Sequence, residues 1–209
     1  MRTNLKDRIR RRVKQHPAVF NEFIDHVLDR DDKKVLVCPA NEFVLGGLKL
    51  EWTEALVASR VACILFEGNL DVTGMLSNES LSGGPMLIVD GDLHCGALDK
   101  GGAYLLVLGD LICEGVVLCE YNDGVLRVGG AVQAQALISL DQDVYVEGGV
   151  QCPYLDWEDD LRAAMVDEAF DLENDPEAVT PDGDRIRQRL RAGAPILRDA
   201  TPEAAAPSR

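Results

Sequence analysis

Apolar and polar positions alternate around a short phrase that recurs through the middle of the chain. The phrase reads apolar residue, any residue, glycine, any residue, and then leucine or valine. Its copies occupy residues 44–48, 66–70, 89–93, 107–111, 128–132 and 146–150. The glycines of successive copies are separated by 22, 23, 18, 21 and 18 residues. A repeat of this length is typical of a solenoid.

The apolar residues two before, two after and four after each glycine follow a period of two, which predicts strands with one buried face. A step of about 20 residues is too short for two strands and a helical crossover, which need about 30. It fits one turn of a parallel β-coil with internal columns of side chains. The residues predicted to form the core are Val89, Leu93, Cys95, Val107, Leu111, Cys113, Val128, Val132, Val146, Val150 and Cys152. An antiparallel sandwich or barrel remains the alternative.

Two local features interrupt this pattern. The glycine of each phrase weakens strand propensity, so a bend or bulge is expected there. Residues 51–60, which follow the first phrase, predict a short inserted helix. Trp52, Leu56 and Val57 are expected on its buried side.

The ends of the chain have a different pattern, which divides the chain into four parts. We predict an N-terminal helical cap over residues 1–34, a β-solenoid over 35–155, an acidic C-terminal helical segment over 156–199 and a disordered tail over 200–209. Leu5, Ile9 and Val13 give the first segment an apolar helical face. Helices at both ends would cap the coil and favour a discrete particle over a filament.

Charge narrows the range of partners. The net charge of −15 at pH 7 argues against nucleic acid and anionic membranes as partners. Residues 1–14 hold seven basic residues and one acidic, whereas residues 141–177 hold 13 acidic residues and one basic. No apolar run reaches the roughly 18 residues of a membrane span, and the first residues lack the apolar stretch of a signal peptide. A cytoplasmic protein is therefore expected.

Acidic residues at outward positions are the candidates for contact with a basic partner. Three flank the glycines of the phrases, a second group lies in a predicted turn, and a third follows the last repeat, beside a tryptophan. Loops and turns of this kind protrude from a regular body and often carry binding residues. The predicted partner-binding residues are Asp90, Asp92, Asp110, Glu120, Tyr121, Asp123, Asp156, Trp157, Glu158, Asp159 and Asp160.

Catalytic and metal-binding chemistry has weaker support. Stacking would bring Asp92 and Asp110 close together, alongside Asn69, and paired carboxylates can perform acid–base catalysis or bind calcium. His94 lies on the outward alternation, as a catalytic histidine would. A polar outer face explains these residues more simply, and the aromatic content of 5% is low for a sugar-binding surface. We therefore predict no catalytic residue, no metal ligand and no cofactor.

The six cysteines lack the paired short spacing of a zinc site or a redox pair. Cys95, Cys113 and Cys152 share one register of the repeat, where a small apolar side chain packs well. The pattern assigns no role to the other three, which are Cys38, Cys63 and Cys119.

The phrases at 89–93 and 107–111, the turn at 121–124 and the ending at 189–197 resemble the bactofilin-like, or polymer-forming, bacterial proteins. The likeness covers roughly residues 60–152 and the tail. It implies a mainly β fold, a right-handed parallel β-helix, to which the pattern of the terminal segments adds the predicted α-helical caps. Bactofilins have an uncapped coil with short tails, so the long helical ends of this chain are a departure. Some members of such groups sit beside secreted toxins, which implies an immunity role.

Three functions follow as hypotheses. The first is a non-catalytic protein-binding solenoid, most concretely an immunity-type inhibitor that binds a basic toxin or effector through its acidic surface. The second is a self-assembling scaffold of bactofilin type, whose partner is another copy of itself. The third is a carbohydrate- or acyl-transfer enzyme built on a β-helix.

Overall fold

The computed structural model describes residues 9–10, 13–16, 33–80, 83–121 and 123–198. The chain divides into two compact units, Met1–Tyr154 and Leu155–Arg209. Each unit is described by itself. The predicted disordered tail at 200–209 and most of the predicted N-terminal helical cap at 1–34 lie outside the described residues.

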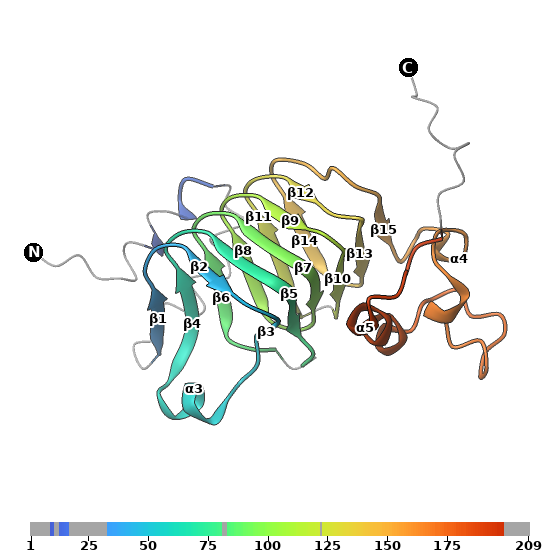
Figure 1. Ribbon diagram of the computed structural model, residues 1–209, viewed down its shortest axis with the longest axis horizontal. Coiled ribbons are helices and arrows are strands. Elements are labelled where there is room, and N and C mark those ends of the chain that lie inside the picture. The colour runs from blue at the N-terminus through green and yellow to red at the C-terminus, as the bar shows by residue number, and fades with distance from the viewer. Residues whose placement is uncertain (1–8, 11–12, 17–32, 81–82, 122, 199–209) are drawn as a thin grey trace, which may run out of the picture. The chain divides into compact units, whose positions relative to one another are not determined.

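The first unit is a parallel β-solenoid (Figure 1). One of its sheets, sheet A, contains six strands in the order β1-β4-β6-β8-β11-β14, and each neighbouring pair is parallel. The strands are β1 (Lys34–Cys38), β4 (Val61–Phe66), β6 (Met86–Val89), β8 (Tyr104–Val107), β11 (Val125–Val128) and β14 (Asp143–Val146). Neighbours in the sheet come from successive repeats, so the predicted parallel coil is confirmed and the antiparallel alternative is wrong.

The chain passes from each strand of sheet A into a second parallel sheet, sheet B. Its central path in the first unit runs β12-β9-β7-β10-β13, and β5 joins β7 to β2 and β3. The strands are β2 (Glu42–Val44), β3 (Leu48–Lys49), β5 (Leu70–Asn78), β7 (Leu93–Lys100), β9 (Leu111–Cys113), β10 (Val116–Glu120), β12 (Val132–Gln133) and β13 (Ala136–Leu140). The coil thus encloses one apolar core between its walls.

The internal columns follow the predicted register. Phe66, Val89, Val107, Val128 and Val146 are successive partners in sheet A. The predicted core residues that are buried are Val89, Leu93, Cys95, Val107, Leu111, Cys113, Val128 and Val132. In each column, apolar side chains of successive coils therefore stack on one another, and together they fill the interior of the coil.

The last coil departs from this pattern. Val146 and Cys152 are only half-buried. Val150 is 37% exposed, so its prediction as a core residue is wrong. Its bridge partner is Val132 in the preceding coil, and among the described residues no strand pairs with it on the other side. A residue of an outermost coil lacks one of the two neighbours that bury the same position elsewhere.

A ladder of side chains, here called the corner ladder, runs along the turn between sheets A and B. Each Oδ1 atom of an Asn or Asp accepts a hydrogen bond from the backbone N–H of the equivalent residue in the next coil, at 2.7–3.0 Å. The ladder consists of Asn41, Asn69, Asp92 and Asp110, and the last N–H belongs to Ala131. These bonds satisfy backbone donors at a corner, between the regular strands.

In four of the six phrases, the glycine directly precedes a residue whose N–H donates to the ladder, and this glycine makes room for the ladder. A Cβ atom on Gly68, Gly91, Gly109 or Gly130 would lie 2.0–2.3 Å from the Oδ1 atom of the preceding coil. The glycine is therefore a steric requirement of the ladder. The expected bend is present as well, because these glycines lie between two strands.

The register of the first coil against the second differs from the register that the repeated phrase predicts. Asn41 is its ladder residue, so Ala40, and not Gly46, is the counterpart of Gly68. Ala40 takes a φ of +70°, a left-handed conformation that glycine favours. Gly46 lies beside Gly74 instead, whose N–H donates to its carbonyl oxygen at 2.9 Å. The pattern missed this register because the corner of the first coil carries alanine.

The inserted helix is present, but its predicted buried face is wrong. Helix α3 (Glu54–Ala58) begins after the N-cap Thr53, whose side chain accepts a hydrogen bond from Leu56 N at 3.2 Å. The helix buries no residue, and Trp52 and Val57 are 45% and 61% exposed. A single short turn that protrudes from the coil has little against which to pack.

The described N-terminal residues lie on the side of the coil. Residues 9–10 and 13 are helical, and Ile9 and Val13 are buried in one cluster with Leu65, Ile88 and Leu106. These three residues come from β4, β6 and β8, in the middle of sheet A. The cluster accounts for the apolar helical face, whereas the capping role of residues 1–34 stays a prediction.

The second unit contains short helices joined by turns. Strand β15 (Tyr154–Asp156) spans the boundary between the units, and the helices are α4 (Leu161–Ala164), the 3-10 helix η2 (Asp167–Ala169) and α5 (Gly183–Ala192). Phe170 is buried, and the Arg162 guanidinium lies 4.8 Å from its ring centre. Arg185 contacts Asp171 at 2.7 Å. The helical character predicted for 156–199 is present in these pieces, but their role as a cap stays a prediction.

The corner ladder predicts a non-additive pair of substitutions. Gly91→Ala should destabilise the protein by about 1–3 kcal/mol because the new methyl group would overlap Asn69 Oδ1. Asn69→Ala should cost about 1 kcal/mol through the lost hydrogen bond. In the double variant the methyl group gains space, so Gly91→Ala should cost less in the Asn69→Ala background. Urea unfolding of the four proteins measures this coupling, and strictly additive costs would contradict the steric role of the glycine.

Candidate functional site

Asp92 and Asp110, predicted to bind a partner, form part of the corner ladder. Stacking brings them together as expected, since the N–H of Asp110 donates to Asp92 Oδ1 at 2.8 Å. Both side chains are half-buried. One oxygen of each carboxylate is thus held by the backbone, which gives both residues a structural role. Asp90 lies nearby but lines a small gap with Ile9 and Val13.

The predicted turn residues occupy the connection between β10 and β11. Glu120 and Tyr121 are half-buried, whereas Asp123 is exposed. Tyr121 takes a φ of +91°, which is uncommon for a residue with a side chain. The carbonyl oxygens of Glu120 and Tyr121 accept hydrogen bonds from Gln142 Nε2 at 2.9 and 3.0 Å. Asp123 is therefore the residue of this group that is most open to solvent.

The predicted acidic residues at the start of the second unit are mostly exposed, but Asp156 is half-buried and accepts a hydrogen bond from Glu158 N at 2.9 Å. Trp157 is 64% exposed, and Glu158, Asp159 and Asp160 are exposed beside it. Asp160 caps α4 by accepting a hydrogen bond from Ala163 N at 3.1 Å. Among the described residues, none of these three carboxylates forms an ion pair. They present uncompensated negative charge next to a large aromatic surface.

A histidine–carboxylate pair lies on the outer face of sheet B. His94 Nδ1 is 2.9 Å from Asp71 Oδ1, and the two side chains are 43% and 38% exposed. The residues are register partners on β7 and β5. Sequence reasoning considered His94 but missed Asp71. A signal was present, because both residues stand three positions after the glycine of a phrase and stacking therefore places them side by side.

This pair lines a hollow of about 210 Å³, here called the outer hollow. Phe43 on β2 and Glu114 after β9 also line it, and Phe43 is 67% exposed. The complete lining is Phe43, Asp71, Val72, Thr73, His94, Cys95, Gly96, Ile112 and Glu114. The outer hollow thus combines an exposed aromatic ring, two carboxylates and an imidazole.

A second polar group is buried inside the coil, at the end of β7. Lys100 is 1% exposed, and its ammonium donates to Gly101 O at 3.1 Å. It lies between Asn78 and Cys119 in one inward row of sheet B. Burial lowers the pKa of Lys100 to about 7. The nearby Cys119 raises this pKa, and the nearby Arg127 lowers it. A lysine with so little access to solvent has a structural role here.

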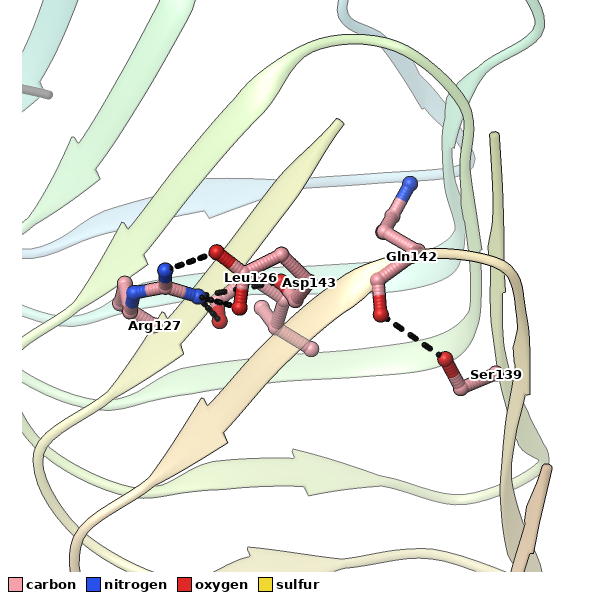
Figure 2. Close-up of polar contacts among 5 residues, drawn as sticks. All are labelled: Leu126, Arg127, Ser139, Gln142 and Asp143. Carbon is pink, nitrogen blue, oxygen red and sulfur yellow. Dashed lines mark hydrogen bonds and ion pairs between the residues drawn. The ribbon is translucent and has the colours of Figure 1, made fainter. Parts of the chain in front are cut away.

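Strands β11 and β14 of sheet A carry a buried arginine and its carboxylate partner, as Figure 2 shows. Arg127 on β11 is 1% exposed, and its Nη1 atom donates to Asp143 Oδ1 at 2.9 Å and to Leu126 O at 3.1 Å. A second, shorter contact joins Arg127 Nη2 to Asp143 Oδ2. Ser139 Oγ donates to the carbonyl oxygen of Gln142 at 3.1 Å. The bidentate pair of Arg127 and Asp143 fixes β14 against β11 at the last coil.

The structure places the three cysteines that the pattern left unassigned. Cys38 is the partner of Phe66 and continues its internal column, Cys63 lies in the cluster around Ile9, and Cys119 lies beside Lys100. Burial raises the pKa of both Cys63 and Cys119 to about 12. All six cysteines are free. Cys63 and Cys119 are therefore core residues rather than reactive thiols.

The described part of the chain contains no group of three or more His, Cys, Asp or Glu side chains arranged to hold a metal ion. None of its helices has the length and apolarity needed to cross a membrane.

The buried amine predicts a pH-dependent effect of Lys100→Met. The folded pKa of about 7 lies below the usual value of about 10.4. Between these pH values the unfolded chain binds a proton that the folded chain does not, so wild-type stability rises with pH across this window. The stability of the variant relative to the wild type should therefore increase by up to about 4 kcal/mol as the pH falls from 10 to 6.

Urea unfolding at pH 6, 7, 8 and 9 checks this expectation. The control is Lys49→Met, which removes a lysine whose side chain is 73% exposed and should give a difference that changes little with pH. An equal effect of Lys100→Met at pH 6 and pH 9 would show that its amine is not desolvated in the folded state.

Comparison of the chain with protein-family models, with curated proteins and with solved structures finds no match. The likeness to bactofilin-like proteins therefore remains an expectation that rests on the residues quoted for it.

Proposed function

We propose that this protein is a non-catalytic β-solenoid that binds a basic partner protein through acidic surface residues. In its most concrete form it is an immunity-type inhibitor of a basic toxin or effector. The net charge of −15 and the rigid parallel coil support a binding role. The resemblance to bactofilin-like proteins, some of which sit beside secreted toxins, supports the immunity version.

The observation that carries the proposal is the exposed segment 157–160. Trp157 is 64% exposed and stands next to three exposed carboxylates that form no ion pair within the described residues. Tryptophan is enriched among the residues that dominate binding energy at protein interfaces. Uncompensated carboxylates around it would attract a basic surface and raise the association rate at low salt. Aromatic contact and charge thus favour the same class of partner.

Several other charges of the second unit are already paired. Arg185 contacts Asp171, and Arg198 contacts Asp167 at 2.6 Å. Such exposed pairs contribute little to stability, but they neutralise the carboxylates involved. Glu158, Asp159 and Asp160 differ from these paired residues because they form no ion pair within the described residues and follow an exposed tryptophan.

The enzyme hypothesis has less support. Asp92 and Asp110 each commit an oxygen to the corner ladder. His94 has a carboxylate partner, as catalytic histidines often do. However, no hydroxyl or thiol among the described residues donates a hydrogen bond to it. A binding function requires no such nucleophile.

The finer features of the fold and its location belong to the same proposal. We propose a right-handed winding, as the bactofilin-like resemblance implies, and helical caps at both ends, as the apolar pattern of the terminal segments predicts. Free cysteines at all six positions fit a reducing compartment, which supports a cytoplasmic protein. A bacterial source is proposed from the resemblance alone.

Self-assembly is the second candidate, and the first coil favours it. Leu36 and Leu45 are 44% and 85% exposed. Among the described residues, β1 pairs only with β4 and so has a free edge. A free edge flanked by exposed apolar side chains can pair with another copy of the chain.

The binding proposal predicts that a basic protein is captured from the native cell at low salt and released at high salt. The immobilised chain with Trp157→Ala, Glu158→Gln, Asp159→Asn and Asp160→Asn should lose most of this capture. Asn retains the capping function at 160. Quantitative mass spectrometry of the eluates at about 50 mM and about 500 mM salt measures the effect, since interactions between exposed charges are screened as salt rises.

The matched control removes three other exposed charges of the same unit, with Glu173→Gln, Asp175→Asn and Glu177→Gln. This control should capture the same protein as the wild type. Equal loss in both variants, or no salt-sensitive capture at all, would count against the proposal.

The scaffold candidate predicts concentration-dependent assembly. Sedimentation velocity should show particles that grow with protein concentration, and Leu36→Ser with Leu45→Ser should keep the protein in small particles. Val179→Ser, which changes an apolar side chain that is 71% exposed in the second unit, is the control and should assemble normally. Small particles of the wild type at every concentration would exclude a filament-forming scaffold.

A further inference from the structure

We infer that the outer hollow, lined by Phe43, Asp71, His94 and Glu114, is a socket for an arginine side chain of the basic partner. The identity of the partner rests on the proposed function. The recognition chemistry rests on the hollow alone and can be tested without the partner.

The socket is built by the register of four adjacent strands. Phe43, Asp71, His94 and Ile112 are successive partners on β2, β5, β7 and β9. Parallel strands lie about 4.8 Å apart, so these outward side chains form one row across sheet B. Glu114 follows directly after β9 and lines the same hollow. The position of each group is thus set by the rigid coil rather than by a loop.

The polar groups of the hollow favour a cation. His94 fixes the orientation of Asp71 through the 2.9 Å contact of its Nδ1 atom with Oδ1. Among the described residues nothing hydrogen-bonds to the second oxygen of Asp71, and Glu114 forms no ion pair. Two carboxylates in one hollow attract positive charge. A metal ion would be one such cation, but the described residues supply no cluster of three suitable ligands.

The aromatic ring distinguishes arginine among cations. Phe43 is 67% exposed, so its ring is available for stacking. A guanidinium group is planar, stacks on aromatic rings and donates several hydrogen bonds to carboxylates in fixed directions. Lysine offers a compact charge without the planar surface. An arginine can therefore contact the ring and the carboxylates at the same time.

The size of the hollow indicates one side chain rather than a complete small molecule. Its volume of about 210 Å³ is below the roughly 300–1,000 Å³ of pockets that hold drug-sized ligands. The hollow is also open on the surface of the coil, where a side chain projecting from another protein could enter it.

Nuclear magnetic resonance with a small probe tests the socket directly. N-acetyl-arginine amide, titrated into the ¹⁵N-labelled full chain at low salt, should produce saturable shifts at residues 71–73, 94–96 and 112–114. N-acetyl-citrulline amide, which has nearly the same shape but no charge, should produce much smaller shifts. Shifts of equal size from both probes, or shifts spread evenly over the acidic surface, would overturn the inference.

Variants locate the interaction. Asp71→Asn with Glu114→Gln should weaken arginine binding about three- to tenfold, and Phe43→Leu should weaken it by a smaller factor, as expected for exposed charge and cation–π contacts. The control, Glu54→Gln with Asp141→Asn, changes the net charge by the same amount at exposed positions elsewhere in the first unit. Equal weakening by the control would show that only overall charge matters and would overturn the socket.

The outcomes separate this inference from the proposed function. If the wild type and the variant with Asp71→Asn and Glu114→Gln capture the same partner equally well, this result overturns the socket and supports the binding function. Arginine binding in the hollow, with no protein captured from the cell, would support the socket and count against the proposed function.

Discussion

The hydrogen bond from one coil's backbone to the preceding coil's Asn or Asp determines much of this structure. A parallel coil must turn a corner between sheets, and at that corner backbone donors leave the regular strand pairing. Asn41, Asn69, Asp92 and Asp110 supply the missing acceptors. Each acceptor occupies the space that a side chain would need in the next coil, so the chain must place glycine there. One interaction thus explains the glycine in four of the six phrases and the Asn or Asp that follows it in three of them.

The interior of the coil was largely predictable, because burial in columns requires apolar residues at a fixed spacing. Val89, Val107 and Val128 illustrate this, since their order in the repeat matches their order in sheet A. The first coil was not predictable in the same way. There the corner position is Ala40, and the visible glycine, Gly46, belongs to a different corner. Among the described residues no preceding coil places a ladder oxygen beside Ala40, so the steric need for glycine that marks the later corners is absent from this one.

The candidate sites were predictable only in part, because register brings together residues that no local motif connects. Asp71 and His94 are far apart in the chain and become neighbours because each follows its glycine by three positions. Phe43 joins them through the shifted first coil, which the repeat could not have revealed. In contrast, Trp157 and the three carboxylates after it are adjacent in the chain, so the sequence already showed that they lie together. The structure added only that their side chains are exposed.

The corner ladder ends at Ala131, which has no oxygen on its side chain to offer the following coil. Duplication of a coil between Asn69 and Asp110 would reproduce both an acceptor and the glycine beside it, so the fold could lengthen there without new chemistry. Duplication after Ala131 would inherit a corner without an acceptor. A coil duplicated in the middle of the array would therefore keep the hydrogen bonds of its corner, whereas one duplicated at the end would lose them.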